Sequence, residues 1–181
     1  MTEIKEIGDF VDYRPPSWDR LFMRLAYEYA SKSKDPSSKI GAVIVKGNRP
    51  ILFGYNGFPE GVNDNLERLC NRELKLYLTE HAERNAVDMA ASLGISSKGG
   101  ILYTQIMPCS GCAKAILQAN VCELVLHKPA NDYFEKCFTG HTWKKEHEMS
   151  NLMFSEKGLK IRWMDECVDS VGYFGGKKVS V

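Results

Sequence analysis

The arrangement that most constrains this chain is a histidine and two cysteines, each placed where a helix is expected to begin. His81 lies two residues before Glu83, and Cys109 and Cys112 follow Pro108 in the run Pro-Cys-Ser-Gly-Cys. Imidazole and thiolate are ligands of zinc, and three protein ligands leave its fourth position free, which is typical of a catalytic site and not of a closed structural one. The fold must then bring two distant helix starts together around one ion.

The spacing within each motif suits this arrangement. Cys109 and Cys112 are three residues apart at the start of a helix, so both thiols lie on one side of the first turn. The positive end of the helix favours the thiolate, which is the form that binds metal. Glu83 does not easily share the ion with His81, because side chains two residues apart on a helix diverge. We therefore expect Glu83 to carry protons beside the open position.

Hydrophobic periodicity and turn residues predict the elements around these motifs. Helices are expected over residues 18–32, 66–78, 80–92, 109–119 and 142–157, with N-caps at Ser17, Thr79 and Thr142 for three of them. Strands are expected over 40–46, 51–55, 101–104, 123–127 and 159–164, and residues 129–139 read as a loop with room for a short helix. Helices alternating with strands predict an α/β fold with a mixed sheet covered on both faces.

Two of these helices carry apolar side chains that are expected to face the core. In the first helix they are Trp18, Leu21, Phe22, Leu25, Ala26 and Tyr29, and in the second they are Leu69, Leu74, Tyr77 and Leu78.

Composition is that of one ordinary globular domain. The chain has 181 residues, of which 44% are hydrophobic and 26% charged. Residues 1–16 read as a lead-in and residues 165–181 as a peripheral tail whose end at 175–178 is expected to be mobile.

The same composition bears on location and partners. No segment has the pattern of a signal peptide or the length of a membrane span, which predicts a cytoplasmic protein (in the host cytoplasm if a phage encodes it) with six reduced cysteines. The net charge of +1 gives no global field for nucleic acid or an anionic membrane, so the expected partner is a small molecule.

The two motifs together form the H-x-E and P-C-x-x-C signature of zinc-dependent nucleobase deaminases. The chain resembles the cytidine and deoxycytidylate deaminase superfamily over about residues 18–163, and more closely its deoxycytidylate (dCMP) deaminase branch of bacteria and phages. Besides the two motifs, the segments that carry the likeness are Ser33–Ser37, Ile40–Val45, Gly54–Pro59, Asn85-Ala86 and Ala113-Lys114.

The resemblance implies a three-layer α/β/α fold around a five-stranded mixed sheet. It implies one zinc ion per subunit on His81, Cys109 and Cys112, with Glu83 moving protons. The implied reaction is hydrolysis of dCMP to dUMP and ammonia, which supplies thymidylate synthesis.

Nucleotide contacts and regulation follow from the same resemblance. Asn56 and its neighbours Gly54, Tyr55 and Gly57, together with Lys34, are the implied nucleotide-binding residues, for substrate or for an effector at a subunit interface. Allosteric members of the family respond to dCTP as activator and dTTP as inhibitor, with Mg²⁺ accompanying a bound triphosphate. They assemble as dimers, tetramers or hexamers, so we expect a homo-oligomer.

Three segments depart from the family pattern, namely Gln105–Met107, Asn120 and Lys128–His147. The last leaves the contacts to the substrate phosphate open. On charge alone the candidates are Arg84, Lys34, Lys39 and Lys128, each of which is more often a solvated surface residue.

Several alternatives remain open at this point. The substrate could be another cytosine nucleotide or nucleoside, such as 5-substituted dCMP, dCTP or cytidine. An RNA- or DNA-editing deaminase would need a basic, aromatic-rich surface, which a net charge of +1 does not favour. A purely structural zinc ion would make Glu83 dispensable. A second metal site could form from Cys70, His127, His141 and His147, although their spacing does not require one.

Overall fold

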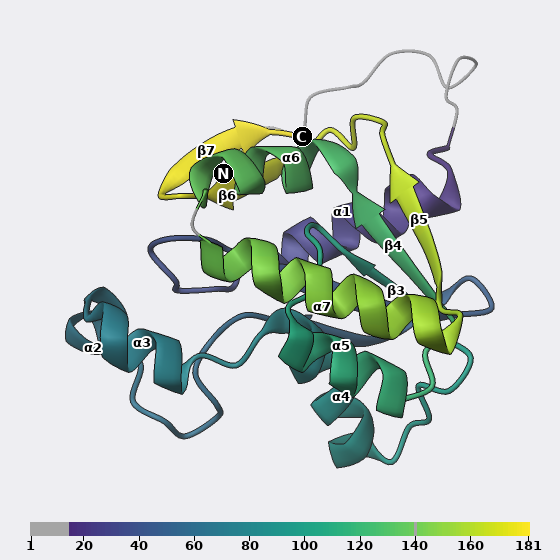
Figure 1. Ribbon diagram of the computed structural model, residues 1–181, viewed down its shortest axis with the longest axis horizontal. Helices are drawn as coiled ribbons and strands as arrows, with labels where there is room; N and C mark the ends of the chain where they lie inside the picture. Colours follow the sequence, from purple (N-terminus) through teal and green to yellow (C-terminus); the bar gives the residue numbers. More distant parts are fainter. Residues whose placement is uncertain (1–14, 140) are drawn as a thin grey trace, which may run out of the picture.

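The computed structural model describes the backbone of residues 15–139 and 141–181, and the side chains of these residues except 141 and 142. Most of the predicted lead-in lies outside these ranges. At the centre is a five-stranded sheet with the order β2-β1-β3-β4-β5 (Figure 1). Its strands are β1 (Gly41–Lys46), β2 (Arg49–Tyr55), β3 (Ile101–Thr104), β4 (Glu123–His127) and β5 (Lys160–Met164). β1 runs antiparallel to β2 and β3, whereas β3, β4 and β5 are parallel, so the sheet is mixed.

The helices of the described chain are α1 (Trp18–Ala30), α2 (Leu66–Cys70), α3 (Arg72–Leu78), α4 (Ala82–Leu93), α5 (Ser110–Gln118), α6 (Lys128–Cys137) and α7 (His141–Lys157). None of them is long and apolar enough to cross a membrane.

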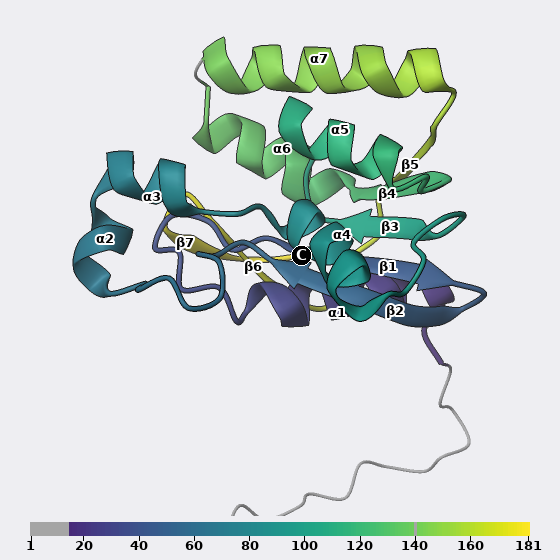
Figure 2. The same ribbon diagram turned by 90° about the horizontal axis from the view of Figure 1, so that it is seen from below.

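Two glycines show that helices cover both faces of the sheet. A Cβ added at Gly41 would lie 2.0 Å from the carbonyl oxygen of Ala26 in α1, and one at Gly54 would lie 2.1 Å from that of Ala82 in α4. Gly54 pairs with Ala42 across the β1–β2 ladder, so its face is opposite to that of Gly41. Figure 2 shows α5 and α7 stacked on one side of the sheet. The predicted three-layer α/β/α fold with a mixed five-stranded sheet is confirmed.

The central strands are buried on both faces, because helices lie above and below them. Every residue of β4 is buried, and so is β1 except for its last residue. The largest fully buried apolar side chains of the core are Phe22, Phe154, Phe174, Met23, Ile44, Leu52, Leu102, Ile116, Leu124 and Leu126.

The predicted core face of α1 is partly wrong. Its buried residues are Phe22, Met23, Ala26, Tyr27 and Ala30, whereas Trp18 is 54% exposed. The predicted cap is confirmed, since the Ser17 hydroxyl accepts a hydrogen bond from the backbone N–H of Arg20 at 3.2 Å.

The predicted helix over 66–78 is two helices that form an arm beside the sheet (Figure 1). Asn71 separates them, and its side chain accepts a hydrogen bond from Leu74 N at the start of α3. Leu69 is buried as expected, but Leu74 and Tyr77 are 44% and 83% exposed, so the prediction that they face the core is wrong.

The C-terminal half differs from the prediction in two places. Residues 128–137 form α6, a helix of ten residues that takes up most of the segment predicted as a loop with room for a short helix. The tail predicted to be peripheral forms a hairpin of β6 (Val171–Phe174) and β7 (Lys177–Ser180), which lies beside α6 in Figure 1. Phe174 is fully buried, and the backbone N–H of Lys39 donates to the carbonyl of Tyr173 at 2.9 Å, so the hairpin is joined to the main body.

Candidate active site

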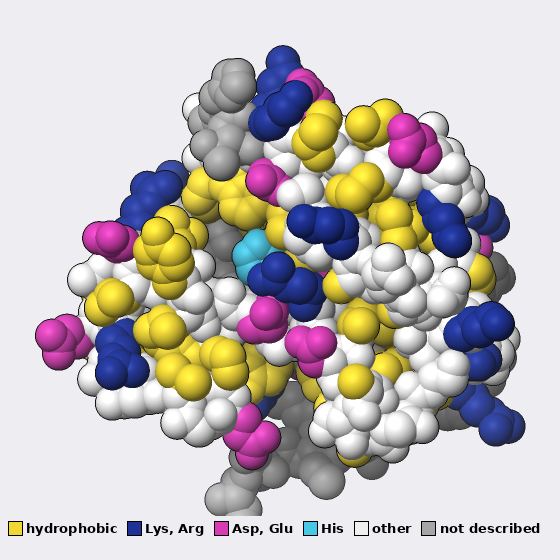
Figure 3. Space-filling model, turned by 60° about the horizontal axis from the view of Figure 1, so that its bottom comes forward, with side chains coloured by type: hydrophobic (Ala, Val, Ile, Leu, Met, Phe, Trp, Pro, Cys, Tyr) yellow, Lys and Arg dark blue, Asp and Glu magenta, His cyan; other side chains and the backbone are white. Residues whose placement is uncertain are grey.

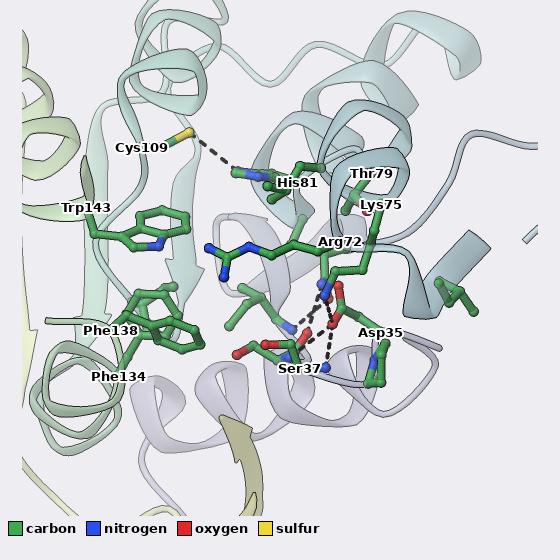
Figure 4. Close-up of a pocket in the computed structure, with 18 of the residues that line it drawn as sticks. Asp35, Ser37, Arg72, Lys75, Thr79, His81, Cys109, Phe134, Phe138 and Trp143 are labelled. Carbon is green, nitrogen blue, oxygen red and sulfur yellow. Dashed lines mark hydrogen bonds and ion pairs between the residues drawn. The ribbon is translucent and has the colours of Figure 1, made fainter. Parts of the chain in front are cut away.

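The three predicted metal ligands lie together. His81 Nδ1 is 3.4 Å from Cys109 Sγ and 3.4 Å from Cys112 Sγ, and the three ligand atoms lie within 4.8 Å of one another (Figure 4). A tetrahedral zinc ion with bonds of about 2.0 Å to nitrogen and about 2.3 Å to sulfur would hold such atoms about 3.5 Å apart. The donor set and its spacing therefore fit zinc.

Each motif begins a helix, but α4 begins two residues later than expected and α5 one residue later. His81 is the N-cap of α4 and Cys109 the N-cap of α5. Thr79, the predicted cap of the first of these helices, instead ends α3. His81 thus has extended backbone geometry, and its ring lies at the N-terminal end of α4, where this helix is next to α5.

The pKa values of the two thiols are shifted in opposite directions. Hydrogen bonds from the Cys112 thiol and from His81 lower the pKa of Cys109 to about 3. The pKa of Cys112 is raised, because it shares that hydrogen bond with Cys109 and is buried. The hydrogen bond to Cys109 also raises the pKa of His81. A cation between these groups would favour deprotonation of all three.

Glu83 lies directly beside this cluster. Its Oε2 is 3.4 Å from Cys112 Sγ, and the residue is only 3% exposed. Burial raises the pKa of the Glu83 carboxyl group, since a carboxylate is poorly solvated there. A carboxyl group with a raised pKa holds a proton more readily than an exposed one, which suits a general acid–base.

The segment Gly54–Gly57 supports the start of α4. Gly54 allows β2 to approach the first turn of α4, the Tyr55 carbonyl accepts from Asn85 Nδ2 at 2.8 Å, and Gly57 pairs with Glu80 through two backbone hydrogen bonds. The Glu80 carboxylate accepts from His81 N at 2.8 Å and from Arg84. These contacts position the histidine and the glutamate.

Asn56 has a different environment from its neighbours. Its Oδ1 accepts from Ile40 N at 2.8 Å and its Nδ2 donates to the Ser38 carbonyl at 2.9 Å. It is the one member of Gly54–Gly57 that lines the cavity described below.

The loop before Cys109 is held by residues that the sequence analysis did not single out. Glu146 of α7 accepts from Ser110 N at 2.8 Å, and Ser150 of the same helix donates to the Pro108 carbonyl at 2.8 Å. Asn131 of α6 accepts from Met107 N at 2.9 Å. A carboxylate at a helix N-terminus is favourable, but nothing in the local sequence around Glu146 indicates which helix it would cap.

A cavity of about 450 Å³ opens beside the cluster, which is a usual size for a small-molecule site. His81, Glu83 and Cys109 line one end, and the aromatic residues Phe134, Phe138 and Trp143 form a wall (Figure 4). Figure 3 shows a histidine side chain lying in a hollow of the surface. Polar and charged residues that also line the cavity include Asp35, Ser37, Arg72, Lys75 and Thr79.

The four cations considered for the phosphate do not line this cavity. Lys34 forms an ion pair with Asp64 at 2.7 Å and Lys128 one with Asp132 at 2.5 Å. Arg84 pairs with Glu80 and lies over Gly111, and Lys39 donates to the Ser33 carbonyl.

The second metal site considered from sequence does not form among the side chains that the structure describes. His127 contacts the Tyr27 hydroxyl at 2.7 Å and the Glu166 carbonyl at 3.0 Å. His147 lies 3.6 Å from Glu135, and Cys70 lines the cavity. The side chain of His141 lies outside the described residues. Within the described part, the group of residues able to hold a metal ion is His81, Cys109 and Cys112.

The family model "Cytidine and deoxycytidylate deaminase zinc-binding region" matches residues 16–128, which include both motifs. The chain belongs to the cytidine and deoxycytidylate deaminase family. The resemblance inferred from sequence is therefore confirmed, and the protein is an enzyme of the zinc-dependent deaminase type. The zinc-binding family and the His/Cys/Cys cluster agree on zinc as the cofactor.

Individual members of this deaminase family are similar over much of the chain. An uncharacterized deaminase of Aliivibrio fischeri is 33% identical over 147 residues, covering 81% of this chain and 93% of that protein. Human deoxycytidylate deaminase is 38% identical over 133 residues, covering 69% of this chain and 71% of that protein. The dCMP deaminase of cyanophage S-TIM5, solved in complex with dCMP and dUMP, has the same fold with a TM-score of 0.60 at 22% identity, covering 84% of this chain and 100% of that one.

Proposed function

We propose that this deaminase hydrolyses dCMP to dUMP and ammonia. The observation that carries the proposal is Glu83, which is almost fully buried and lies 3.4 Å from Cys112 at the end of a cavity of nucleotide size. The likeness to human deoxycytidylate deaminase supports dCMP as the substrate. Residues 1–181 would then form one catalytic unit.

His81, Cys109 and Cys112 would hold the zinc ion. When bound, zinc makes a water molecule nucleophilic at neutral pH. The cluster supplies three ligands, which leaves one coordination position free.

Glu83 would move the protons of the reaction. It accepts a proton from the attacking water and gives it to ring N3 of the cytosine, while a bond forms between the water oxygen and C4. Glu83 then passes the second proton of the water to the amino nitrogen. The C4–N bond breaks, ammonia leaves and the C4 carbonyl of dUMP remains, so water and dCMP account for both products.

A substrate panel tests this assignment against its alternatives. Initial rates are measured for dCMP, 5-methyl-dCMP, dCTP, cytidine and a cytosine-containing oligonucleotide. The proposal predicts the highest kcat/KM for dCMP. A clear preference for cytidine, dCTP or the oligonucleotide would contradict it, and a preference for 5-methyl-dCMP would assign the enzyme to the 5-substituted nucleotide.

Regulation and assembly are finer parts of the same proposal, and the family resemblance supports them. dCTP with Mg²⁺ would activate the enzyme, dTTP would inhibit it, and the protein would be a homo-oligomer. Rates at low dCMP with and without each triphosphate, together with light scattering in the same solutions, test these points. Rates that neither nucleotide changes would remove regulation from the proposal, and the mass of a single chain would remove the oligomer.

A further inference from the structure

The charged side chains around the cavity are not all neutralised by one another. Lys75 and Asp35 form an ion pair at 2.9 Å, with side chains only 12% and 9% exposed. Asp35 also accepts backbone hydrogen bonds from Ser37 at 2.7 Å and Ser38 at 3.2 Å. This pair closes one side of the cavity and leaves neither charge available to a ligand without a cost in desolvation.

Arg72 is in a different position. It lines the same cavity and is exposed, and none of the ion pairs among the described residues includes it. Figure 4 shows its side chain reaching from the start of α3 into the cavity, with the guanidinium group facing Trp143. Lys75, one turn later, points away from it toward Asp35.

The position of Arg72 relative to the reacting end matters for a ligand that spans the cavity. His81, Glu83 and Cys109 lie at one end, and Arg72 enters from the arm formed by α2 and α3. A nucleotide with its base at the zinc cluster carries its charged group away from that end. A cation that is neither buried nor already paired can bind this charged group. Arg72 satisfies both conditions.

We propose that Arg72 binds the 5′-phosphate of the nucleotide substrate, an inference that rests on the proposed function of the site. A guanidinium group presents two parallel N–H donors that match two phosphate oxygens, so it fixes orientation as well as charge. Lys34, Lys39, Arg84 and Lys128 do not compete for this role, since each has a partner elsewhere and none lines the cavity.

The consequence is selectivity for nucleotides over nucleosides. A substrate without a phosphate loses the contact with Arg72 but keeps every contact at the base. Arg72 is therefore a specificity-determining residue of the site, and its loss is expected to change the ratio of kcat/KM for a nucleotide to kcat/KM for its nucleoside.

The experiment measures kcat/KM for dCMP and for deoxycytidine with the zinc-loaded full-length protein and three variants. Arg72→Ala is expected to lower the ratio of the two values by roughly 10- to 100-fold, which is the loss of a charge-assisted hydrogen bond. Arg72→Lys should give an intermediate ratio, because it keeps the charge but not the paired donors. Arg49→Ala, an exposed arginine at the start of β2, is the matched control and should keep the wild-type ratio.

The outcomes separate this inference from the proposed function. If Arg72→Ala deaminates dCMP with the wild-type ratio, Arg72 does not bind the phosphate and the proposed reaction still stands. If the wild-type protein itself does not prefer dCMP to deoxycytidine, both are overturned. Equal unfolding temperatures of the variants and the wild type would show that a lowered ratio does not come from a loss of folding.

Discussion

Glu83 Oε2 and Cys112 Sγ lie 3.4 Å apart, although the two residues are 29 positions apart in the chain and come from different helices. The contact depends on the N-terminal ends of α4 and α5 lying next to each other. A carboxyl group from α4 then lies beside a thiol from α5. Burial raises the pKa of Glu83 there. The packing of two helix starts thus places the proposed proton carrier beside the proposed metal ligands.

Removal of zinc should end deamination. Dialysis against a strong chelator is expected to abolish turnover of dCMP, and added zinc should restore it, because the ion makes the attacking water nucleophilic. Cys112→Ala should bind less than one zinc ion per chain, measured by elemental analysis. Cys122→Ala removes an exposed thiol away from the cluster and is the matched control, expected to retain zinc. Full activity in a protein shown to be free of metal would contradict the assignment.

Gly54→Ala should damage the site through the backbone. The added Cβ would lie 2.1 Å from Ala82 O and 2.6 Å from Ala86 N, so α4 must move. We expect a loss of about 1–3 kcal/mol in the free energy of unfolding and a lower kcat. At Gly57 the added Cβ would meet only the Tyr55 ring, at 3.4 Å, so Gly57→Ala is the milder control. Similar losses in both variants, measured by urea denaturation, would argue against this explanation.

The stability that His127 contributes should fall as the solution becomes acidic. Burial lowers the pKa of His127, against a smaller opposing effect of Asp165 and Glu166, so the folded chain keeps the ring neutral. The unfolded chain takes up this proton below about pH 6.5 and then binds more protons than the folded one. The contribution is fully present above that pH and is lost as pH falls from there toward the folded-state pKa.

The measurement is urea denaturation above and below about pH 6.5. His127→Gln should have a smaller pH dependence than the wild type. Some dependence should remain, because burial also lowers the pKa of His147. Equal losses of stability on acidification in His127→Gln and the wild type would contradict the prediction.

The metal cluster could be predicted because its signals are local. Each of the two helix starts can be recognised from a few neighbouring residues, and so can the spacing of Cys109 and Cys112. The glycine turn after α4 and the left-handed residue after α5 were also predictable, and Gly94 and Asn120 have φ values of 65° and 53°.

The wall of the cavity could not be predicted in the same way. Phe134 belongs to α6, which reads as a loop because Pro129 and Asn131 are common in turns. Pro129 in fact stands in the first turn of the helix, where its missing N–H leaves no hydrogen bond unmade. Trp143 lies in a segment that was predicted to be helical. The sequence does not show which aromatic rings it contacts, because these, including Phe134 and His81, belong to other segments.

The C-terminal hairpin was missed for a related reason. Gly175 and Gly176 have φ values of 58° and 76°, which suit a two-residue hairpin turn. The adjoining strand β7 is short and begins with two exposed lysines, so its sequence gives little sign of a strand. The burial of Phe174 against α6 supplies the stability that local propensity does not.

The most direct test of the account compares the zinc content and dCMP deamination of the wild-type protein with those of Glu83→Gln. Glutamine has nearly the same shape as glutamate but cannot carry the proton. The account predicts one zinc ion per chain in both proteins and a kcat for dUMP formation that is roughly 10²- to 10⁴-fold lower in the variant. A Glu83→Gln protein that holds zinc and forms dUMP at the wild-type rate would contradict it.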